Sequence, residues 1–245
     1  MPGAAPARVW VILPTYNEAE NLEPLVAAVR ERLPGSSRIL IVDDNSPDGT
    51  GEIAARLATE AAEVSVLHRE LKEGLGPAYL AGFELALASG AELIVEMDAD
   101  FSHDPAYLPQ LLAAAEDADL VLGSRYVEGG GVADWGPLRR FISRGGSAYA
   151  RVLLGVRVRD LTGGFKVIRR EVLESIDLRS ITARGYAFQV ETTYRALRRG
   201  FRVVEVPIVF RDRREGSSKM SGPIVAEAIW RVPAMRLRRQ WRRSA

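Results

Sequence analysis

The chain of 245 residues contains no cysteine and only two histidines, His68 and His103. Without cysteine there is no disulfide framework and no cysteine-ligated metal, which is consistent with a reducing compartment. Two histidines are also too few for a histidine-rich metal centre. These absences exclude the disulfide-stabilised secreted class and the cysteine- or histidine-rich metalloproteins.

Long hydrophobic runs are also missing. A membrane-spanning helix needs roughly 20 continuous apolar residues, whereas the longest candidates here, such as residues 9–13 and 93–95, have the length of strands. The N-terminus lacks the basic stretch and apolar core of a signal peptide. We therefore expect a chain that does not cross a bilayer by itself.

Two common nucleotide-binding fingerprints do not occur. No Gly-x-Gly-x-x-Gly follows the first apolar run, and the chain has no Gly-Lys-Ser/Thr loop. The first absence argues against a dinucleotide-dependent oxidoreductase, and the second argues against a P-loop nucleotidase.

The formal net charge of +1 conceals an asymmetry between the body and the C-terminal end of the chain. Glu227 is the last acidic residue, and the residues around Trp230 and Trp241 are strongly basic. Such a stretch can lie on an anionic membrane surface, or it can be a solvated helix whose arginines pair with the acidic body. We expect a basic helix over residues 223–245. Its arginines are Arg231, Arg236, Arg238, Arg239, Arg242 and Arg243.

Short apolar runs alternate with amphipathic segments along the first two-thirds of the chain. This alternation predicts an α/β fold with a mostly parallel, doubly wound central sheet flanked by helices. Residues 1–8 are small and Pro-rich, and we expect them to form a flexible lead-in to one domain over residues 9–222. The expected strands cover residues 9–13, 39–42, 64–67, 93–97 and 120–123.

The remainder of the chain is less regular. We expect helices over residues 138–154 and 186–199 and a strand over 164–168. Pro207 separates two further apolar runs, which indicates an edge strand or a break. A charged loop containing Gly and Ser follows over residues 211–222.

Polar segments follow the predicted strands directly. In doubly wound sheets ligands bind beyond the carboxyl ends of the strands, so these segments should converge on one site. They are residues 14–18, 43–48, 98–103 and 124–125.

The strongest local feature is the pair Asp98 and Asp100, which stands just past an apolar strand. Mg²⁺ and Mn²⁺ take oxygen ligands and often share them with phosphates. A metal bound here would neutralise the charge that develops on a departing diphosphate. Taken alone, the Asp-x-Asp pattern is more often a solvated turn at the end of a strand.

Two other strand-end segments favour a nucleoside. Asp43 and Asp44 extend an apolar strand and can accept hydrogen bonds from a base or a ribose, although Asx turns and helix caps use the same residue types. The ring of Tyr16 could stack on a base, or its loop could serve only to cap the next helix. Arg213 and Lys219, in the Gly/Ser-containing loop, are candidates for closing over phosphates.

Taken together, these motifs resemble family 2 glycosyltransferases of the GT-A fold, a Rossmann-like architecture. The motifs shared with many sugar transferases lie at residues 14–18, 42–50, 74–76, 98–100 and 123–126. Others resemble the narrower family of dolichol- and polyprenol-phosphate mannose synthases, in the branch without transmembrane helices. They lie at residues 101–105, 160–163, 185–191, 205–207 and 210–219, so that the resemblance covers about residues 9–222.

The resemblance implies a role for particular residues. The nucleotide-sugar GDP-mannose would be held by Pro14, Tyr16, Glu18, Asp44, Asp98, Arg213 and Lys219. Mg²⁺ or Mn²⁺ would be held by Asp98 and Asp100, with Ser102 at a position where some members have a Gln ligand. The catalytic and acceptor-phosphate residues would be Asp100, Arg125, Arg139 and Ser143. Residues 9–125 would form the nucleotide-sugar half and residues 126–222 the acceptor half.

The implied reaction is an inverting transfer of mannose from GDP-mannose to a polyprenyl (dolichyl-type) phosphate, which gives polyprenyl-phosphate mannose and GDP. A phosphate monoester is largely dianionic at neutral pH and needs no strong base to attack, so the protein mainly positions and stabilises anions. A UDP-glucose or other UDP-sugar transferase is an alternative, and a non-catalytic nucleotide-sugar-binding subunit of a membrane complex is a remote one. We expect a cytoplasmic protein, peripheral at the cytoplasmic face of a membrane through its basic tail or a membrane-protein partner, and no nucleic-acid partner.

Overall fold

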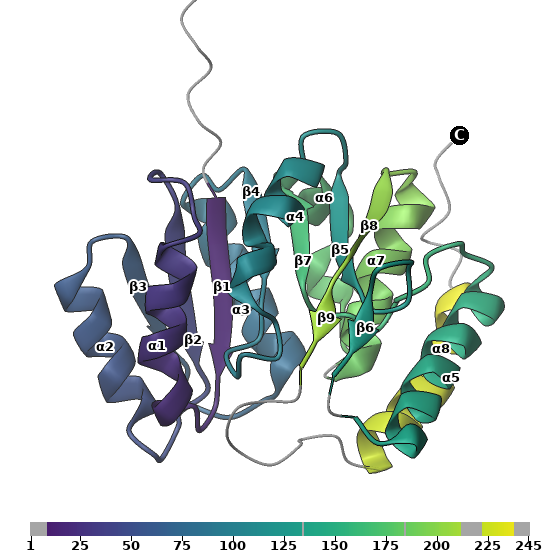
Figure 1. The fold of residues 1–245 in the computed structure, drawn as a ribbon, viewed down its shortest axis with the longest axis horizontal. Helices are drawn as coiled ribbons and strands as arrows, with labels where there is room; N and C mark the ends of the chain where they lie inside the picture. The colour runs from purple at the N-terminus through teal and green to yellow at the C-terminus, as the bar shows by residue number, and fades with distance from the viewer. Residues whose placement is uncertain (1–8, 134, 184, 212–221, 238–245) are drawn as a thin grey trace, which may run out of the picture.

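A seven-stranded sheet with the order β3-β2-β1-β4-β7-β5-β8 organises the computed structural model (Figure 1). The structure describes residues 9–133, 135–183, 185–211 and 222–237. The expected lead-in over residues 1–8 lies outside them. The strands of the sheet are β1 (Val9–Thr15), β2 (Arg38–Asp43), β3 (Val64–His68), β4 (Leu93–Glu96), β5 (Leu120–Ser124), β7 (Lys166–Arg169) and β8 (Val203–Pro207).

The sheet is mostly parallel, as the alternation predicts. β1 pairs in parallel with both β2 and β4, and β5 pairs in parallel with β8. β7 is the exception, because it lies antiparallel between β4 and β5. The last strand, β8, ends at Pro207 on the edge of the sheet, where a residue without a backbone N–H is tolerated.

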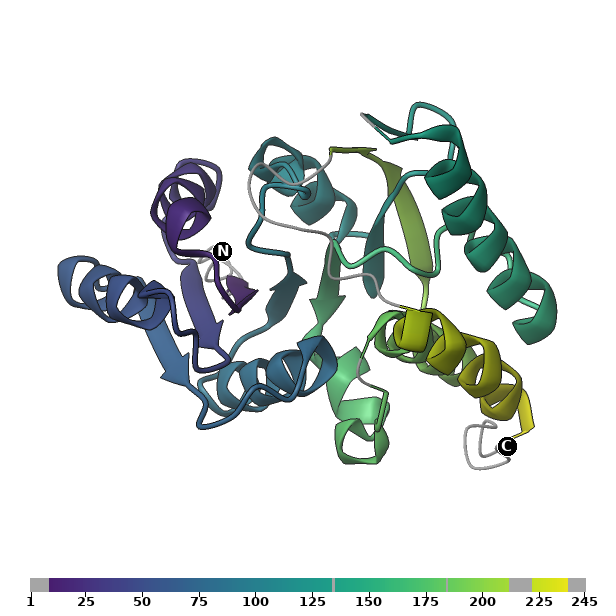
Figure 2. The ribbon, with the colours of Figure 1, turned by 90° about the horizontal axis from the view of Figure 1, so that it is seen from below.

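Helices cover both faces of the sheet, as the view from below shows (Figure 2). α1, α2 and α4 pack on one face, and α3, α6 and α7 pack on the other. The helices are α1 (Ala19–Arg30), α2 (Thr50–Glu60), α3 (Leu75–Ala88), η1 (Pro105–Tyr107), α4 (Leu108–Ala114), α5 (Pro137–Leu154), α6 (Arg170–Ser175), η2 (Leu178–Ser180), α7 (Tyr186–Arg199) and α8 (Gly222–Leu237).

Two hydrophobic cores result, one on each face of the sheet. In β1, successive residues such as Val11 and Ile12 point to opposite cores and are both fully buried, as strands covered on both sides require. Gly82 allows α3 to lie close to β1, because a Cβ there would come within 2.6 Å of Ile12 Cγ2.

The part of the chain that follows β5 adds a two-stranded sheet and a helix pair. β6 (Gly131–Val132) pairs with β9 (Val209–Phe210). α5 and α8 lie side by side at the right of Figure 1, where Val232 and Met235 of α8 join the core that contains Leu154. The predicted C-terminal helix is therefore present as α8, while residues 238–245 lie outside the described part. No helix in the described part is long and apolar enough to span a membrane.

Candidate active site

A pocket with about 680 Å³ of empty space opens where β4 and β5 end. It brings together Asp98, Asp100, Ser102, Arg125 and Arg139, five of the residues singled out in the sequence. The expected convergence of polar strand-end segments is therefore confirmed for residues 98–103 and 124–125, two of the four segments. The other lining residues are Leu75, His103, Gly123, Trp135, Thr162, Gly163, Gly164, Gln189, Ile208 and Phe210.

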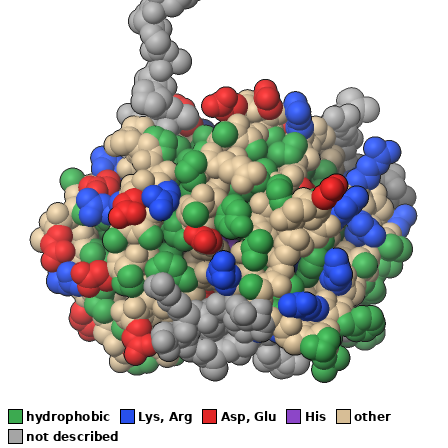
Figure 3. Space-filling model, in the orientation of Figure 1, with side chains coloured by type: hydrophobic (Ala, Val, Ile, Leu, Met, Phe, Trp, Pro, Cys, Tyr) green, Lys and Arg blue, Asp and Glu red, His purple; other side chains and the backbone are tan. Residues whose placement is uncertain are grey.

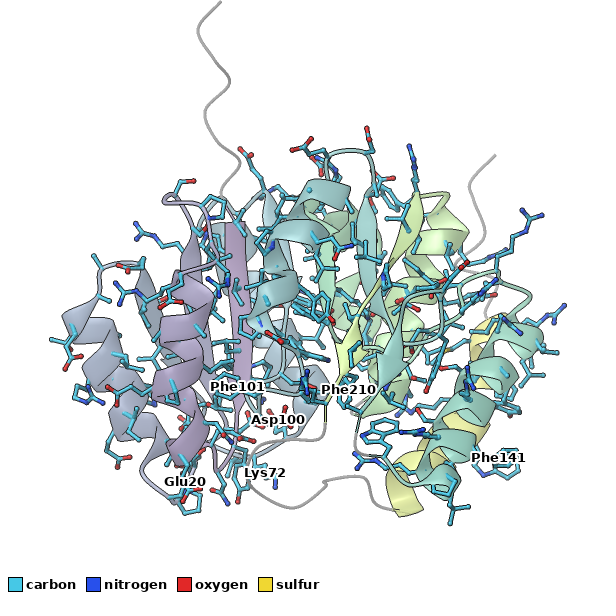
Figure 4. All side chains as sticks on the ribbon, in the orientation of Figure 1. Glu20, Lys72, Asp100, Phe101, Phe141 and Phe210 are labelled. Carbon is cyan, nitrogen blue, oxygen red and sulfur yellow. The ribbon has the colours of Figure 1, made fainter. Side chains whose placement is uncertain are left out.

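The two carboxylates are presented by a bend in the loop after β4. Phe101 has a φ of 61°, a left-handed conformation that is uncommon outside glycine and is often found at functional sites. Asp100 Oδ1 accepts a hydrogen bond from Ser102 N at 3.0 Å. Figure 4 shows Asp100 at the lower end of the sheet, between Phe101 and Phe210.

Asp98 is held by Tyr79, which the sequence did not single out, and by His103, the last residue of the polar segment 98–103. Tyr79 Oη of α3 donates to Asp98 Oδ1 at 3.3 Å, and the backbone N of Asp98 donates to His103 Nδ1 at 3.0 Å. Burial lowers the pKa of His103, so the ring is neutral and its Nδ1 accepts. Asp98 keeps a third of its side chain exposed, at 32%, and so remains open to a ligand.

The oxygen atoms around Asp98 and Asp100 fit a hard divalent cation. Ser102 Oγ is buried and has no hydrogen-bond partner among the described residues, although it lines the same pocket. Within those residues no cluster of three His, Cys, Asp or Glu side chains forms a complete cage. Mg²⁺ and Mn²⁺ do not need such a cage, since waters and substrate phosphates complete their coordination.

Arg125 lies in the pocket with its guanidinium already bound to a carboxylate. Its Nε and Nη2 donate to the two oxygens of Asp160, each at 2.7 Å, and Nη2 also reaches Thr162 Oγ1 at 2.8 Å. Asp160 is fully buried and Arg125 is 6% exposed. The pair is therefore a fixed, desolvated element of the pocket wall, and the positive charge of Arg125 is largely compensated.

Arg139 and Ser143 lie one turn apart on α5 but have different surroundings. The Arg139 guanidinium sits 4.2 Å from the centroid of the Trp135 ring, inside the pocket. Ser143 is not one of the residues that line the pocket, and its Oγ accepts a hydrogen bond from Tyr126 Oη at 2.6 Å. Of the three residues expected at an acceptor phosphate, Arg125 and Arg139 line the pocket of the two aspartates and Ser143 does not.

The residues expected at the nucleoside lie together at the ends of β1 and β2. Asp44 N donates to Thr15 O at 3.0 Å, which places Asp44 beside the loop of Pro14, Tyr16 and Glu18. Asp44 is buried, pairs with Arg69 and accepts a hydrogen bond from Gly74 N at 3.2 Å. None of these four predicted residues lines the pocket of Asp98 and Asp100.

Two of the residues predicted to bind the nucleoside, Tyr16 and Glu18, already contact other side chains of the protein. Lys72 Nζ lies 3.6 Å from the centroid of the Tyr16 ring, so one face of that ring already has a cation against it. Glu18 is buried and accepts a hydrogen bond from Asn21 Nδ2 at 2.9 Å. Arg213 and Lys219 lie outside the described residues.

A buried polar network beneath the pocket was not expected from the sequence. Lys166 of β7 and Glu96 of β4 are both fully buried and lie 3.5 Å apart. Burial raises the pKa of Glu96 and lowers that of Lys166, and each is partly restored by the charge of the other. Lys166 Nζ also donates to Gln189 Oε1 and, at 3.0 Å, to Thr192 Oγ1.

Gln189 connects this network to the pocket. A lysine can only donate, so the amide atom that contacts Lys166 is Oε1, and Nε2 must point elsewhere. A Cβ added at Gly164 would lie 3.3 Å from Gln189 Nε2 and 3.8 Å from Asp98 Oδ1. The amide nitrogen is buried beside Gly164 in the pocket wall, and the interaction of this amide with the Glu96 carboxyl lowers the pKa of Glu96.

A mostly parallel sheet with an Asp-x-Asp loop at the carboxyl end of a central strand is the arrangement expected of a glycosyltransferase of the GT-A class. The comparisons with known proteins give the family. The family model for "Glycosyl transferase family 2" matches residues 10–177, and the chain belongs to this family.

Two curated relatives are about half identical over most of the chain. An undecaprenyl-phosphate mannosyltransferase of Micrococcus luteus is 49% identical over 234 residues, which cover 96% of both chains. A polyprenol monophosphomannose synthase of Mycolicibacterium smegmatis is 51% identical over 227 residues, covering 92% of this chain and 85% of the relative.

Solved structures agree on the fold. A glucosyl-3-phosphoglycerate synthase of Mycobacterium tuberculosis, in complex with phosphoglyceric acid, superposes with a TM-score of 0.73 at 20% identity, covering 96% of this chain and 85% of that one. The same enzyme with Mn²⁺, UDP-glucose and phosphoglyceric acid gives a TM-score of 0.71. The predicted GT-A architecture is thereby confirmed, and so is the assignment as a family 2 glycosyltransferase.

Proposed function

We propose that this enzyme transfers mannose from GDP-mannose to a polyprenyl phosphate with inversion at the anomeric carbon, releasing GDP. The observation that carries the proposal is the pocket that Asp98 and Asp100 line together with the cation of Arg139. The names of the two relatives, each about half identical to this chain, support mannose as the sugar and a polyprenyl phosphate as the acceptor. GDP-mannose as the donor and the division into a nucleotide-sugar half (9–125) and an acceptor half (126–222) are parts of the proposal.

Mg²⁺ or Mn²⁺ would be held by Asp98 and Asp100, with Ser102 Oγ as a further oxygen. When bound, the cation neutralises the negative charge that develops on the departing diphosphate. The solved structures of the glucosyl-3-phosphoglycerate synthase with Mn²⁺ or Mg²⁺ support a divalent metal in this architecture.

Residues of the chain position the diphosphate of the donor and the acceptor phosphate for reaction. Tyr79 orients the Asp98 carboxylate and His103 holds the Asp98 backbone, so the residue is positioned before transfer begins. Arg139 supplies a cation for the acceptor phosphate, and Ser143 lies one turn further along α5. The hydrogen-bonded pair of Arg125 and Asp160 keeps this part of the pocket wall in one geometry. Because the phosphate dianion is itself the nucleophile, no basic side chain has to take a proton from it.

The nucleoside would bind at the neighbouring edge of the sheet. We assign the guanosine to Pro14, Tyr16, Glu18 and Asp44, which lie together at the ends of β1 and β2. We also propose that Arg213 and Lys219, outside the described residues, close over the diphosphate.

The acceptor lipid would be met at a membrane surface through α5. Five apolar side chains are exposed along one side of this helix: Leu138, Phe141, Ile142, Tyr149 and Val152. Phe141 is 77% exposed and projects away from the body of the molecule (Figure 4). A helix with one apolar side facing solvent and its other side packed on the protein is suited to lie in a bilayer interface. We therefore propose a peripheral enzyme at the cytoplasmic face, whether alone or with a membrane-protein partner.

One assay tests the reaction directly. Purified enzyme is incubated with radiolabelled GDP-mannose and a polyprenyl phosphate, with Mg²⁺, with Mn²⁺, or with a chelator. We expect labelled lipid only in the presence of metal. Asp100→Asn is the test variant, and Asp104→Asn, which removes a carboxylate that caps η1 outside the pocket, is the matched control.

The same assay separates the alternatives. UDP-glucose and UDP-GlcNAc replace GDP-mannose in parallel reactions, and faster transfer from either would reassign the donor. Nucleotide binding without any labelled lipid would favour the non-catalytic subunit. Full activity of Asp100→Asn, or full activity in the chelator, would refute the assignment of the metal residues.

A further inference from the structure

A second depression lies on α5, beside the pocket but not part of it. Tyr126, Arg144, Ala148, Arg151 and Arg159 line it, and it is open to solvent, with about 640 Å³ of empty space. Arg144, Ala148 and Arg151 recur at helical spacing, so they share one side of α5. We call this surface the arginine groove.

Within the described residues, no carboxylate pairs with the three guanidinium groups of the arginine groove. Among the described residues, none of them forms an ion pair or a side-chain hydrogen bond, and only Arg144 contacts a ring, with its guanidinium carbon 5.8 Å from the centroid of Tyr126. The carboxylate of Glu205 lies nearby but is engaged, because it accepts hydrogen bonds from Arg159 N, Asp160 N and Ser124 Oγ. The groove therefore concentrates positive charge that the fold does not neutralise.

Several arginines elsewhere on the surface do have partners within the protein. Arg56 pairs with Glu23 and Glu60, and Arg30 pairs with Glu63. Arg236, in the C-terminal helix where the sequence suggested a basic contact surface, donates to Leu153 O at 2.6 Å. Compared with these, the arginines of the groove remain available to an external anion.

The groove borders the apolar side of α5. At 100° per residue, Arg144 and Arg151 fall between the side that packs on the protein and the exposed side that carries Phe141 and Val152. Blue and green side chains accordingly lie next to each other at the lower right of Figure 3, over α5. Basic residues bordering an apolar face are the arrangement of helices that rest on anionic bilayers.

We propose that the arginine groove binds the phosphate headgroup of an anionic phospholipid in the bilayer that α5 contacts. The proposal rests on the bilayer contact described under the proposed function and adds a second anion site to it. Guanidinium groups bind phosphate oxygens in pairs of parallel hydrogen bonds, and three of them line one groove. The site differs from that of the acceptor phosphate, for which Arg139 lies in the pocket with Asp98.

Vesicle binding tests this without any turnover. Full-length enzyme is sedimented with vesicles of phosphatidylcholine alone and of phosphatidylcholine with phosphatidylglycerol. The test variant carries Arg144→Gln, Arg151→Gln and Arg159→Gln. The matched control carries Arg198→Gln, Arg199→Gln and Arg202→Gln, three exposed arginines at the opposite end of the sheet that remove the same charge.

We expect wild type and control to bind the anionic vesicles equally within about twofold. The test variant should bind them about a hundredfold more weakly, from roughly a tenfold or smaller contribution of each arginine near an anionic surface. An Arg→Lys triple at the groove positions should recover only part of this affinity, since lysine keeps the charge but not the paired hydrogen bonds. Thermal unfolding checks that all variants remain folded.

Three results would overturn the proposal. The first is equal loss in the test and control variants, which would indicate a general effect of net charge. The second is full recovery by lysine, which would indicate a diffuse field rather than a headgroup site. The third is displacement from the vesicles by millimolar inorganic phosphate at constant ionic strength, which would assign the groove to a soluble anion. Because no nucleotide-sugar is present, these outcomes are independent of whether the enzyme transfers mannose.

Discussion

Replacing Lys166 with methionine should destabilise the protein by about 3–4 kcal/mol at pH 7. The methionine fills a similar volume but leaves Glu96, which is fully buried, without the ammonium group 3.5 Å away. Breaking a buried pair in this way typically costs about 3–5 kcal/mol. An independent route gives a similar figure: protonating a carboxyl of ordinary pKa near 4.3 at pH 7 costs roughly 3.7 kcal/mol.

The pH dependence gives this prediction a distinctive sign. In Lys166→Met the folded-state pKa of Glu96 rises further above its unfolded value, so the folded protein binds the extra proton. Stability contributed by such a group is present below the unfolded pKa and is lost as pH rises toward the folded pKa. The deficit relative to wild type should therefore shrink by roughly 2.7 kcal/mol between pH 7 and pH 5.

Urea unfolding at pH 5, 6 and 7 measures both effects, and the midpoint of thermal unfolding should fall by about 7–15 °C at pH 7. The double variant Lys166→Met/Glu96→Gln is the control, because it removes the titrating group and should recover much of the loss with no pH trend of its own. A deficit below about 1 kcal/mol at pH 7, or one that is constant with pH, would refute the reasoning.

Further predictions concern the pocket and the membrane surface. Asp98→Asn should lower kcat by about a hundredfold or more and weaken Mn²⁺ binding, with an unchanged unfolding midpoint, and unaltered Mn²⁺ titrations would contradict it. Gln189→Met should reduce kcat/KM about tenfold to a hundredfold, because it removes an amide that lines the pocket with Asp98. Thr192→Val removes another acceptor of Lys166 but lies outside the pocket, so it should have less effect, and equal losses would assign Gln189 a purely structural role. Phe141→Ser should weaken binding to phosphatidylcholine vesicles about tenfold, and undiminished binding in sedimentation would argue against α5 as the bilayer contact.

Most of the sheet could be predicted because each strand carries its own local signal. The apolar runs at β1, β2, β4 and β5 are continuous, since both faces of a parallel sheet are covered, and the intervening helices show helical spacing. The position of β7 could not be predicted. Its placement, antiparallel between β4 and β5, depends on pairing with residues about 45 to 75 positions earlier, which no local pattern encodes.

The candidate site was predictable to the extent that its residues follow strands. Asp98, Asp100 and Ser102 do so, and the structure brings them to one pocket with Arg125 and Arg139. The partner of Arg125 lies 35 positions away, so its pairing with Asp160 appears only in the fold. Glu96 and Lys166 were the available signals for the buried network, because a charged residue inside an apolar strand requires a compensating charge.

The length and position of α5 have a consequence for the lipid substrate. Arg139 and Phe141 are two residues apart, about 3 Å along the helix axis, but lie on nearly opposite sides of the helix, which is about 10 Å wide. A bilayer touching Phe141 is then roughly one helix width from the pocket. The phosphate would have to rise by only that distance, while most of the prenyl chain stays among the acyl chains. Selectivity for prenol length should accordingly be confined to the isoprene units nearest the phosphate.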